Sequence, residues 1–362
     1  MTKYKTVKGF RDIYNTEYKI GKYIKDIIIE ISESYNYKPI ELSEFEYTLL
    51  FTDFYGAEIK DSLYAIDNRY STSISLRNNA VLSMIRSILE NKLYVDKSMP
   101  IKLMSDSKTY KFNKKNRKEK ATSEEFVFVN ANNDSIYIDI ENINLALDVF
   151  YALGMQEVDL ILYKNSLKDY EFKEITDTLE EFDIFYEVDE NKCNTLYDKL
   201  EYDFYYNGIL VASGGRHNNL SKKLSAPSIP SSSLCFDIDE LKNIIEFSSL
   251  VPPMEEELDF LVMSIDNNHK YSLKVASRLR ELGVKVDINY NEYDQNRIRD
   301  FIDRMNIPYT ILINENDINN GIVTVRNSIS KEEGNVVFET FIEELIEQTK
   351  HHHDWFFSTI LK

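Results

Sequence analysis

The stretch from Glu125 to Gly154, EFVFVNANNDSIYIDIENINLALDVFYALG, decides the fold class. Its short apolar runs, Glu125 to Val129 and Ile136 to Ile140, are typical of strands in an antiparallel sheet. Residues 143 to 153 then have the pattern of a helix, and Gly154 follows at the position where a glycine commonly ends one. Strands and a helix without regular βαβ alternation predict an α+β domain.

Two amphipathic helices are predicted upstream of this stretch. The first covers residues 17 to 35 and ends before Pro39, and the second begins near Asn78. The apolar stripe of the first helix is Ile20, Ile24, Ile27, Ile28 and Ile31, and that of the second is Val81, Ile85, Ile88, Leu89 and Leu93.

A second domain is predicted downstream. Pro252 and Pro253, followed by three glutamates, have the composition of a stiff charged linker. Strands and helices then alternate, which predicts a small α/β domain with a mainly parallel sheet. The predicted strands are 258–263, 284–290, 309–313 and 322–325, and the predicted helices are 270–282, 294–305 and 338–348. We expect domains over 1–250 and 258–350, a linker over 251–257 and a tail over 351–362.

The composition is that of a globular protein, with 43% hydrophobic and 29% charged residues. No run approaches the roughly 18 apolar residues of a membrane span, and the N-terminus lacks an apolar signal region, so we expect a cytoplasmic protein without a membrane partner. Cys193 and Cys235 have no ligand-spaced partners, so we expect two buried thiols, no metal and no cofactor. The three histidines from His351 also lack a completing carboxylate or cysteine, which favours a loosely packed tail.

The net charge of −18 disfavours nucleic acid, because polyanion binding requires phosphates to be neutralised by Lys and Arg. Residues 108 to 120 are the exception. Their basic side chains are either an anion-binding loop, formed by Lys111, Lys114, Lys115 and Arg117, or a solvated hairpin tip, and both interpretations stay open.

Common catalytic motifs are absent from the sequence. It contains no P-loop, no GxGxxG after a strand, no HExxH and no GxSxG. His217, beside Gly214, Gly215 and Arg216, is a catalytic candidate, but a lone histidine after a glycine turn is more often structural.

Several short segments, in the right order over nearly the whole chain, resemble histidyl-tRNA synthetase. They are Lys8 to Ile13 (the KGxRDI opening), Tyr35 to Tyr47 (motif 1), Leu76-Arg77 with the helix to Leu93, Asn144 to Gly154, Gly214 to Leu220 (GGRYDxL) and the C-terminal α/β unit. The resemblance implies a class II synthetase antiparallel sheet with flanking helices and a C-terminal α/β anticodon-binding-like domain. It also implies a homodimer formed through the motif 1 helix and strand, that is, the segment around Asn36 to Tyr47 and the adjacent helix.

The residues that this family uses for ATP are replaced. A class II synthetase grips ATP with arginines, because a planar guanidinium makes bidentate bonds to phosphate. In our alignment the motif 2 arginine is Lys111 and the motif 3 arginine is Glu240, with Asp237 at a glycine position. Unit charges about 4 Å apart at an effective dielectric near 20 interact by roughly 4 kcal/mol, so reversing one removes several powers of ten in affinity.

The implied histidine pocket is degenerate as well. Asn79 stands at its acidic position, Phe128 and Asn132 near its glutamine and glutamate, and Glu201 at its arginine. The aligned segment from Glu201 to Gly208 keeps Tyr205 and Tyr206. Arg77, Arg86 and Arg216 remain, and internal ion pairs explain them equally well.

The resemblance and these departures together predict a protein that is not an enzyme. The favoured hypothesis is the regulatory subunit of ATP phosphoribosyltransferase in histidine biosynthesis, with a catalytic subunit as partner and with tRNA disfavoured. The alternatives are a tRNA- or ligand-sensing module and a divergent active histidine-tRNA ligase.

Overall fold

The computed structural model describes residues 4–66, 73–96, 100–112, 121–189, 196–248, 250, 258–266, 269–290, 301–302, 307–314, 318–328 and 330–351. The chain divides into two compact units, 1–252 and 253–362. The predicted linker, 251–257, and the tail from residue 352 lie outside the described residues.

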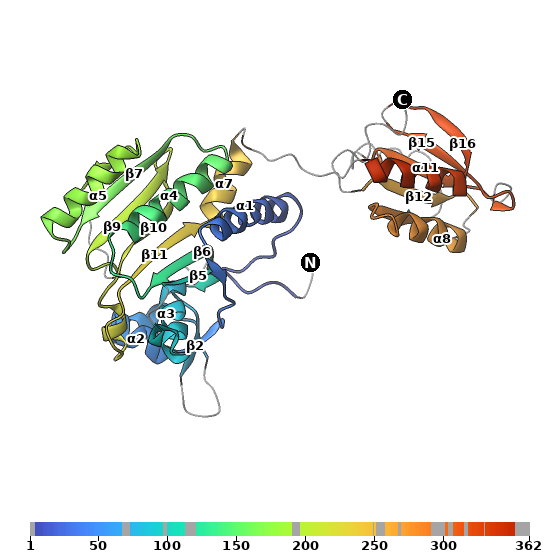
Figure 1. The fold of residues 1–362 in the computed structure, drawn as a ribbon. Helices are drawn as coiled ribbons and strands as arrows, with labels where there is room; N and C mark the ends of the chain where they lie inside the picture. Colours follow the sequence, from blue (N-terminus) through green and yellow to red (C-terminus); the bar gives the residue numbers. More distant parts are fainter. Residues whose placement is uncertain are drawn as a thin grey trace. The chain divides into compact units, whose positions relative to one another are not determined.

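Unit 1 is built on an eight-stranded sheet with the order β1-β5-β6-β11-β10-β9-β7-β8 (Figure 1). Neighbouring strands from β5 to β7 pair antiparallel, and only the two short edge strands pair parallel. The strands are β1 (Lys38–Pro39), β5 (Ile101–Tyr110), β6 (Thr122–Ala131), β7 (Val158–Lys164), β8 (Glu187–Val188), β9 (Leu200–Tyr206), β10 (Ile209–Arg216) and β11 (Ser231–Asp237).

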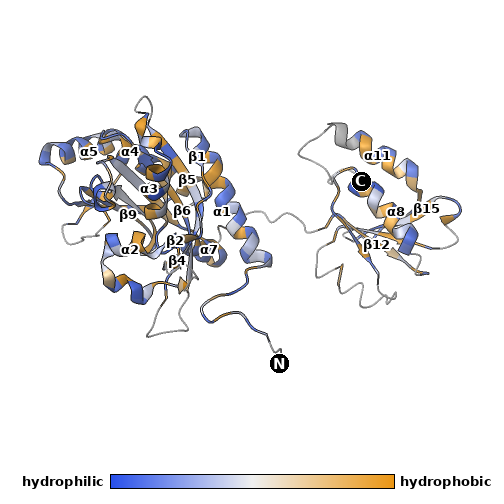
Figure 2. Ribbon diagram, turned by 90° about the horizontal axis from the view of Figure 1, so that it is seen from below, coloured by the Kyte–Doolittle hydropathy of each residue, from blue (hydrophilic) through white to orange (hydrophobic). Residues whose placement is uncertain are grey.

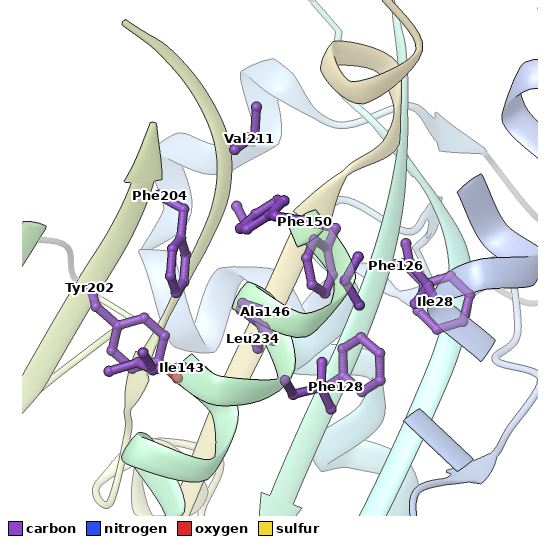
Figure 3. Close-up of a cluster of buried hydrophobic side chains, with 14 of the residues drawn as sticks. Ile28, Phe126, Phe128, Ile143, Ala146, Phe150, Tyr202, Phe204, Val211 and Leu234 are labelled. Carbon is purple, nitrogen blue, oxygen red and sulfur yellow. The ribbon is translucent and has the colours of Figure 1, made fainter. Parts of the chain in front are cut away.

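Helices α1 (Asn15–Ser34), α4 (Tyr137–Ala152) and α7 (Ile238–Phe247) cover one face of this sheet (Figure 1). We call it the helix face. Figure 3 shows Phe126 and Phe128 of β6 meeting Ile28 of α1 and Phe150 of α4. This packing explains the isoleucine stripe of α1, whose hydrophobic and hydrophilic residues alternate along the helix in Figure 2.

Smaller elements complete unit 1. Helix α3 (Ala80–Glu90) packs on the opposite face, against Val127, Val129 and Ala131 of β6. The remaining elements are β2 (Phe45–Tyr47), α2 (Thr48–Tyr55), η1 (Ala57–Ser62), β3 (Ala65–Ile66), β4 (Ile74–Leu76), η2 (Leu93–Val95), α5 (Asp169–Glu181) and α6 (Leu220–Lys223); β2, β4 and β3 form a small sheet in that order.

The predicted strand from Ile136 to Ile140 is wrong, because these residues belong to the start of α4. Ile138 and Ile140 are buried, and so are Asp139 and Asn142, whose side chains have hydrogen-bond partners inside the core. Because polar residues share the buried face of α4, that face has no purely apolar stripe, so its isoleucines imitate strand alternation. Gly154 follows α4 with φ +79°, as the sequence predicts.

Unit 2 has a mixed sheet with the order β13-β12-β14-β15-β16, and the prediction of a mainly parallel sheet is wrong for half of its pairings. Only β12 pairs parallel, with β13 and β14, while β15 pairs antiparallel with β14 and β16. Strand β16 was not predicted from the sequence, because its residues are mostly exposed and include a glycine and polar side chains. Most of the predicted helix 294–305 lies outside the described residues. The elements are β12 (Phe260–Ser264), α8 (His269–Arg280), β13 (Val286–Asn289), β14 (Tyr309–Ile313), β15 (Ile322–Asn327), β16 (Glu333–Val337) and α11 (Phe338–His351).

Candidate functional site: the polar face of the large sheet

The strand register separates the aligned pocket residues onto the two faces of the large sheet. Phe128 pairs with Leu234, which is in register with Gly214 and Tyr202, and all four lie on the helix face. Neighbouring residues along a strand point to opposite faces. Glu201 therefore lies on the other face, which we call the polar face.

The structure corrects the predicted position of Phe128 in the histidine pocket. Its ring is fully buried on the helix face and contacts Tyr37 and Phe236 edge-on, at centroid distances of 5.0 and 5.9 Å. It is a core residue and does not share a face with Glu201. Asn132 has φ +67° and donates from its amide to the carbonyl oxygens of Tyr94 and Asp96, so it holds a turn.

The polar face carries buried carboxylates on β9. Glu201 and Asp203 are fully buried, and the hydroxyl of Tyr205 donates to Asp203 at 3.4 Å. Burial, and next the charge of Asp203, raise the pKa of the nearby Tyr163. Tyr206 packs against the helix-face core instead, so the two aligned tyrosines separate.

One aligned ATP position, Lys111, lies near the carboxylates at one end of the polar face. Glu125 lies opposite Asp237 in the β6–β11 register, and the Lys111 charge acts on Glu125. Asp237 caps α7 by accepting from the backbone N–H groups of Asp239 and Glu240, both at 3.0 Å. The charges of Lys111 and Asp237 thus both act on Glu125 and on the neighbouring thiol of Cys235.

The environment of Glu125 shows how acidic this end is. Burial and the charge of Asp237 raise its pKa, and a 2.9 Å hydrogen bond from Thr109 and the charge of Lys111 only partly oppose them. The neighbouring thiol of Cys235 is only partly exposed, and burial together with the charge of Glu125 holds its pKa well above the ordinary value. Cys193 lies outside the described residues.

Asn79 and Arg77 have structural partners. Asn79 caps α3 by accepting from the N–H of Leu82 at 3.0 Å, and its amide donates to the hydroxyl of Tyr55. Arg77 is buried and donates to the carbonyl oxygens of Leu42, Ser43 and Lys108 at 2.9 to 3.2 Å. Its guanidinium is committed to the backbone.

Arg216 and Arg86 form internal ion pairs, as the sequence allows. The guanidinium of Arg216 is buried on the helix face and makes two bonds to Asp139, at 2.9 and 2.6 Å, and one of 2.8 Å to the Asp134 carbonyl. Arg86 binds both oxygens of Glu46, at 3.1 and 2.7 Å. Sequence reasoning missed Asp139, because it is hidden among the isoleucines that suggested a strand.

His217 is fully buried and stacks on Tyr197, with ring centroids 6.3 Å apart. Its Nδ1 lies 2.8 Å from the hydroxyl of Ser231, which also bonds to two backbone carbonyls. The pair resembles a nucleophile and base, but both side chains are buried, so the structure favours the structural interpretation.

We expect acid to destabilise the fold through His217. Burial lowers its folded-state pKa from 6.5 to about 4. The unfolded chain therefore takes up this proton at higher pH, and the folded state loses up to about 3 kcal/mol as the pH falls from 6.5 to 4. Urea denaturation of wild type and His217→Gln across this range isolates the effect. Identical pH slopes in the two proteins would contradict it.

The basic stretch is only partly described. Lys108 is half exposed and lies 3.5 Å from Glu124, whereas Lys114, Lys115 and Arg117 lie outside the described residues. Within the described ranges, no three His, Cys, Asp or Glu side chains are grouped as metal ligands. Among the helices of the same ranges, none has the length and apolar character to cross a membrane.

Comparisons with known proteins agree with this architecture. Residues 257–348 match the anticodon binding domain family. Histidine-tRNA ligase of Anoxybacillus flavithermus is 21% identical over 93% of this chain and 97% of its own length. The apo histidyl-tRNA synthetase structure from S. aureus superposes with a TM-score of 0.83 at 22% identity, covering 94% of this chain and 99% of that one.

The chain is also similar to the structure of an ATP phosphoribosyltransferase regulatory subunit/histidyl-tRNA synthetase from Bacillus halodurans. The superposition has a TM-score of 0.70 at 14% identity, and covers 87% of this chain and 99% of that one. The sequence matches, the class II synthetase fold of unit 1 and the anticodon-binding domain of unit 2 together support a relationship of this chain to the histidyl-tRNA synthetases.

Proposed function

We propose that this chain is a non-catalytic regulatory subunit that binds and activates the catalytic subunit of ATP phosphoribosyltransferase. The observation that carries the proposal is the acidic end of the polar face. The charges of Lys111 and Asp237 both act on Glu125 there, and Glu240 lies in the first turn of α7. The resemblance implies arginines that grip a polyphosphate at the positions of Lys111 and Glu240. A site with this charge repels ATP. The chain keeps the fold but lacks the arginines that would bind ATP in it.

The charge of unit 2 supports a protein partner over tRNA. Between residues 253 and 362 the sequence has 20 carboxylates against 12 lysines and arginines. Binding to an RNA backbone depends on cations that neutralise phosphates. An anticodon-binding fold with this excess of acid is poorly suited to its ancestral ligand.

The segment implied as a dimer interface presents apolar side chains. Phe45, Tyr47 and Leu49 are 48, 64 and 63% exposed, and grouped exposed apolar residues commonly mark protein contacts. Arg77 and Arg86 anchor this segment through Ser43 and Glu46, so it is preorganised for an interface.

We therefore expect a homodimer formed through this segment. Light scattering at micromolar concentration should give twice the 42.6 kDa chain mass. The variant Tyr47→Lys with Leu49→Lys should be monomeric, because it buries two charges in the interface. Tyr170→Lys is the matched control, since Tyr170 is 63% exposed on α5. A wild-type monomer, or a double variant that still dimerises, would contradict the assignment.

The partner is tested by mixing the chain with a short-form ATP phosphoribosyltransferase from the same organism. Gel filtration with light scattering should show one complex containing both chains. Because an activator must only favour one state of its partner, the contact need not involve the old active site. Separate elution of the two chains at micromolar concentration would count against the proposal.

A second function, a tRNA-sensing module, is favoured by the anticodon-binding match over residues 257–348. It predicts tRNA binding with a steep salt dependence. That dependence should be lost when Lys114, Lys115 and Arg117 are neutralised. If tRNA binds in this way and no complex forms with the phosphoribosyltransferase, this function replaces the first.

A further inference from the structure

A pocket of about 700 Å³ lies in unit 1, on the side away from the polar face. Helix α1 forms one wall, and the second half of β5 forms the other, with Asp106 and Lys108 on the helix face of that strand. The side chains that line it include five basic and five acidic residues. In a chain of net charge −18 this balance sets the pocket apart from the average surface.

The floor of the pocket is a desolvated ion cluster. The ammonium of Lys242, whose side chain is 3% exposed, bonds to Glu124 at 2.9 Å and to Asp239 at 3.0 Å. Gly21 makes room for it, because a Cβ at that position would lie 3.1 Å from Cδ of Lys242. These contacts tie α1, β6 and α7 together, so the floor is rigid.

The rim carries charges of both signs that are only loosely committed. The ammoniums of Lys25 and Lys108 lie 3.7 and 3.5 Å from Glu124, beyond hydrogen-bonding distance. Lys25 is also 3.0 Å from Asp106, whose side chain is 49% exposed. An ion pair this exposed contributes about 0 to 1 kcal/mol, so a ligand can share its members at little cost.

We infer that this pocket binds a small zwitterion with an apolar body. The ligand carboxylate would meet Lys25 and Lys108, and its ammonium would meet Asp106. A ligand with one charge would be repelled by half of the rim, whereas a zwitterion matches both halves. Ile13, Tyr18 and Ile29 also line the pocket and provide contacts for an apolar side chain. An α-amino acid such as leucine or phenylalanine, or a short peptide, has this chemistry.

The test compares ligands that differ only in charge. Isothermal titration of the full-length protein should show L-leucine or L-phenylalanine binding at least about tenfold more tightly than the matching amide or the matching acid without the amine, because each analogue loses one charged hydrogen-bonding group. The amides are L-leucinamide and L-phenylalaninamide, and the acids are 4-methylpentanoate and 3-phenylpropanoate.

Two variants locate the binding. Lys108→Gln and Asp106→Asn change half-exposed side chains at the rim of the pocket, so both should fold, and each should weaken binding of the amino acid about tenfold. Lys173→Gln, at an exposed ion pair on α5, is the control and should bind as wild type does. The inference is overturned if neither amino acid binds more tightly than its analogues, or if the two pocket variants bind like the control. It is also overturned if the acids bind as tightly as the amino acids and Asp106→Asn strengthens them, because the pocket is then an anion site.

Discussion

The purified protein should give no histidine-dependent exchange of pyrophosphate into ATP. Adenylate formation requires ATP to be held while the histidine carboxylate attacks its α-phosphorus and pyrophosphate leaves, and cationic groups at the phosphates stabilise the charge that develops. Here Glu240 replaces one aligned arginine, and Glu125 and Asp237 flank the remaining Lys111. One unit-charge interaction at about 4 Å is worth roughly 4 kcal/mol, so the loss of the attraction alone costs about a thousandfold in affinity. Exchange above background would refute the prediction.

The same charges predict that restoring the two arginines increases the affinity for ATP. Glu240→Arg with Lys111→Arg should raise the affinity for Mg-ATP by about tenfold or more, because it removes one repulsion and restores bidentate phosphate contacts. The pair Glu246→Arg with Lys222→Arg, placed elsewhere in unit 1, makes the same change in net charge and should have little effect. Equal gains in both variants would mean that overall charge, and not the charge at this site, determines ATP binding.

The largest loss of stability should follow Arg216→Ala. This change leaves Asp139 buried without its cation, and a broken buried pair costs about 3 to 5 kcal/mol. Burial already raises the pKa of Asp139 although Arg216 opposes it. Urea denaturation followed by circular dichroism measures the loss. Arg216→Lys should recover part of it, since one ammonium cannot replace bonds that the guanidinium makes to Asp139, Asp134 and Ser135.

Two controls separate the buried charge from simple truncation. Arg278→Ala removes a half-exposed ion pair with Glu281 and should have little effect on stability. Arg216→Met with Asp139→Leu should be more stable than Arg216→Ala, because no charge is left unpaired. If Arg216→Ala matched Arg278→Ala, Arg216 would not have the structural role assigned to it.

Much of the fold was predictable where one side of an element is solvated. The isoleucine stripe of α1 and the glycine after α4 each mark their element correctly. The start of α4 was misassigned because its polar residues, Asp139 and Asn142, are buried by partners distant in sequence. Strand β16 was missed because an exposed edge strand carries no apolar alternation.

The candidate site was less predictable, because alignment without a register cannot assign residues to the faces of a sheet. A shift of one residue in the alignment moves a strand side chain to the other face of the sheet. The alignment therefore could not show that Phe128 lies on the helix face. The acidic end of the polar face was found through the aligned positions Lys111 and Asp237. The part played by Glu125 required the pairing of β6 with β11.

The most direct test of the proposed regulatory role is the rate of a short-form ATP phosphoribosyltransferase from the same organism, measured while this protein is added. A regulatory subunit should raise the rate until the two chains are equimolar and then have no further effect. Glu240→Arg should activate equally, because the proposal gives the old ATP site no role in activation. An unchanged rate at saturating concentrations of this protein would contradict the proposal.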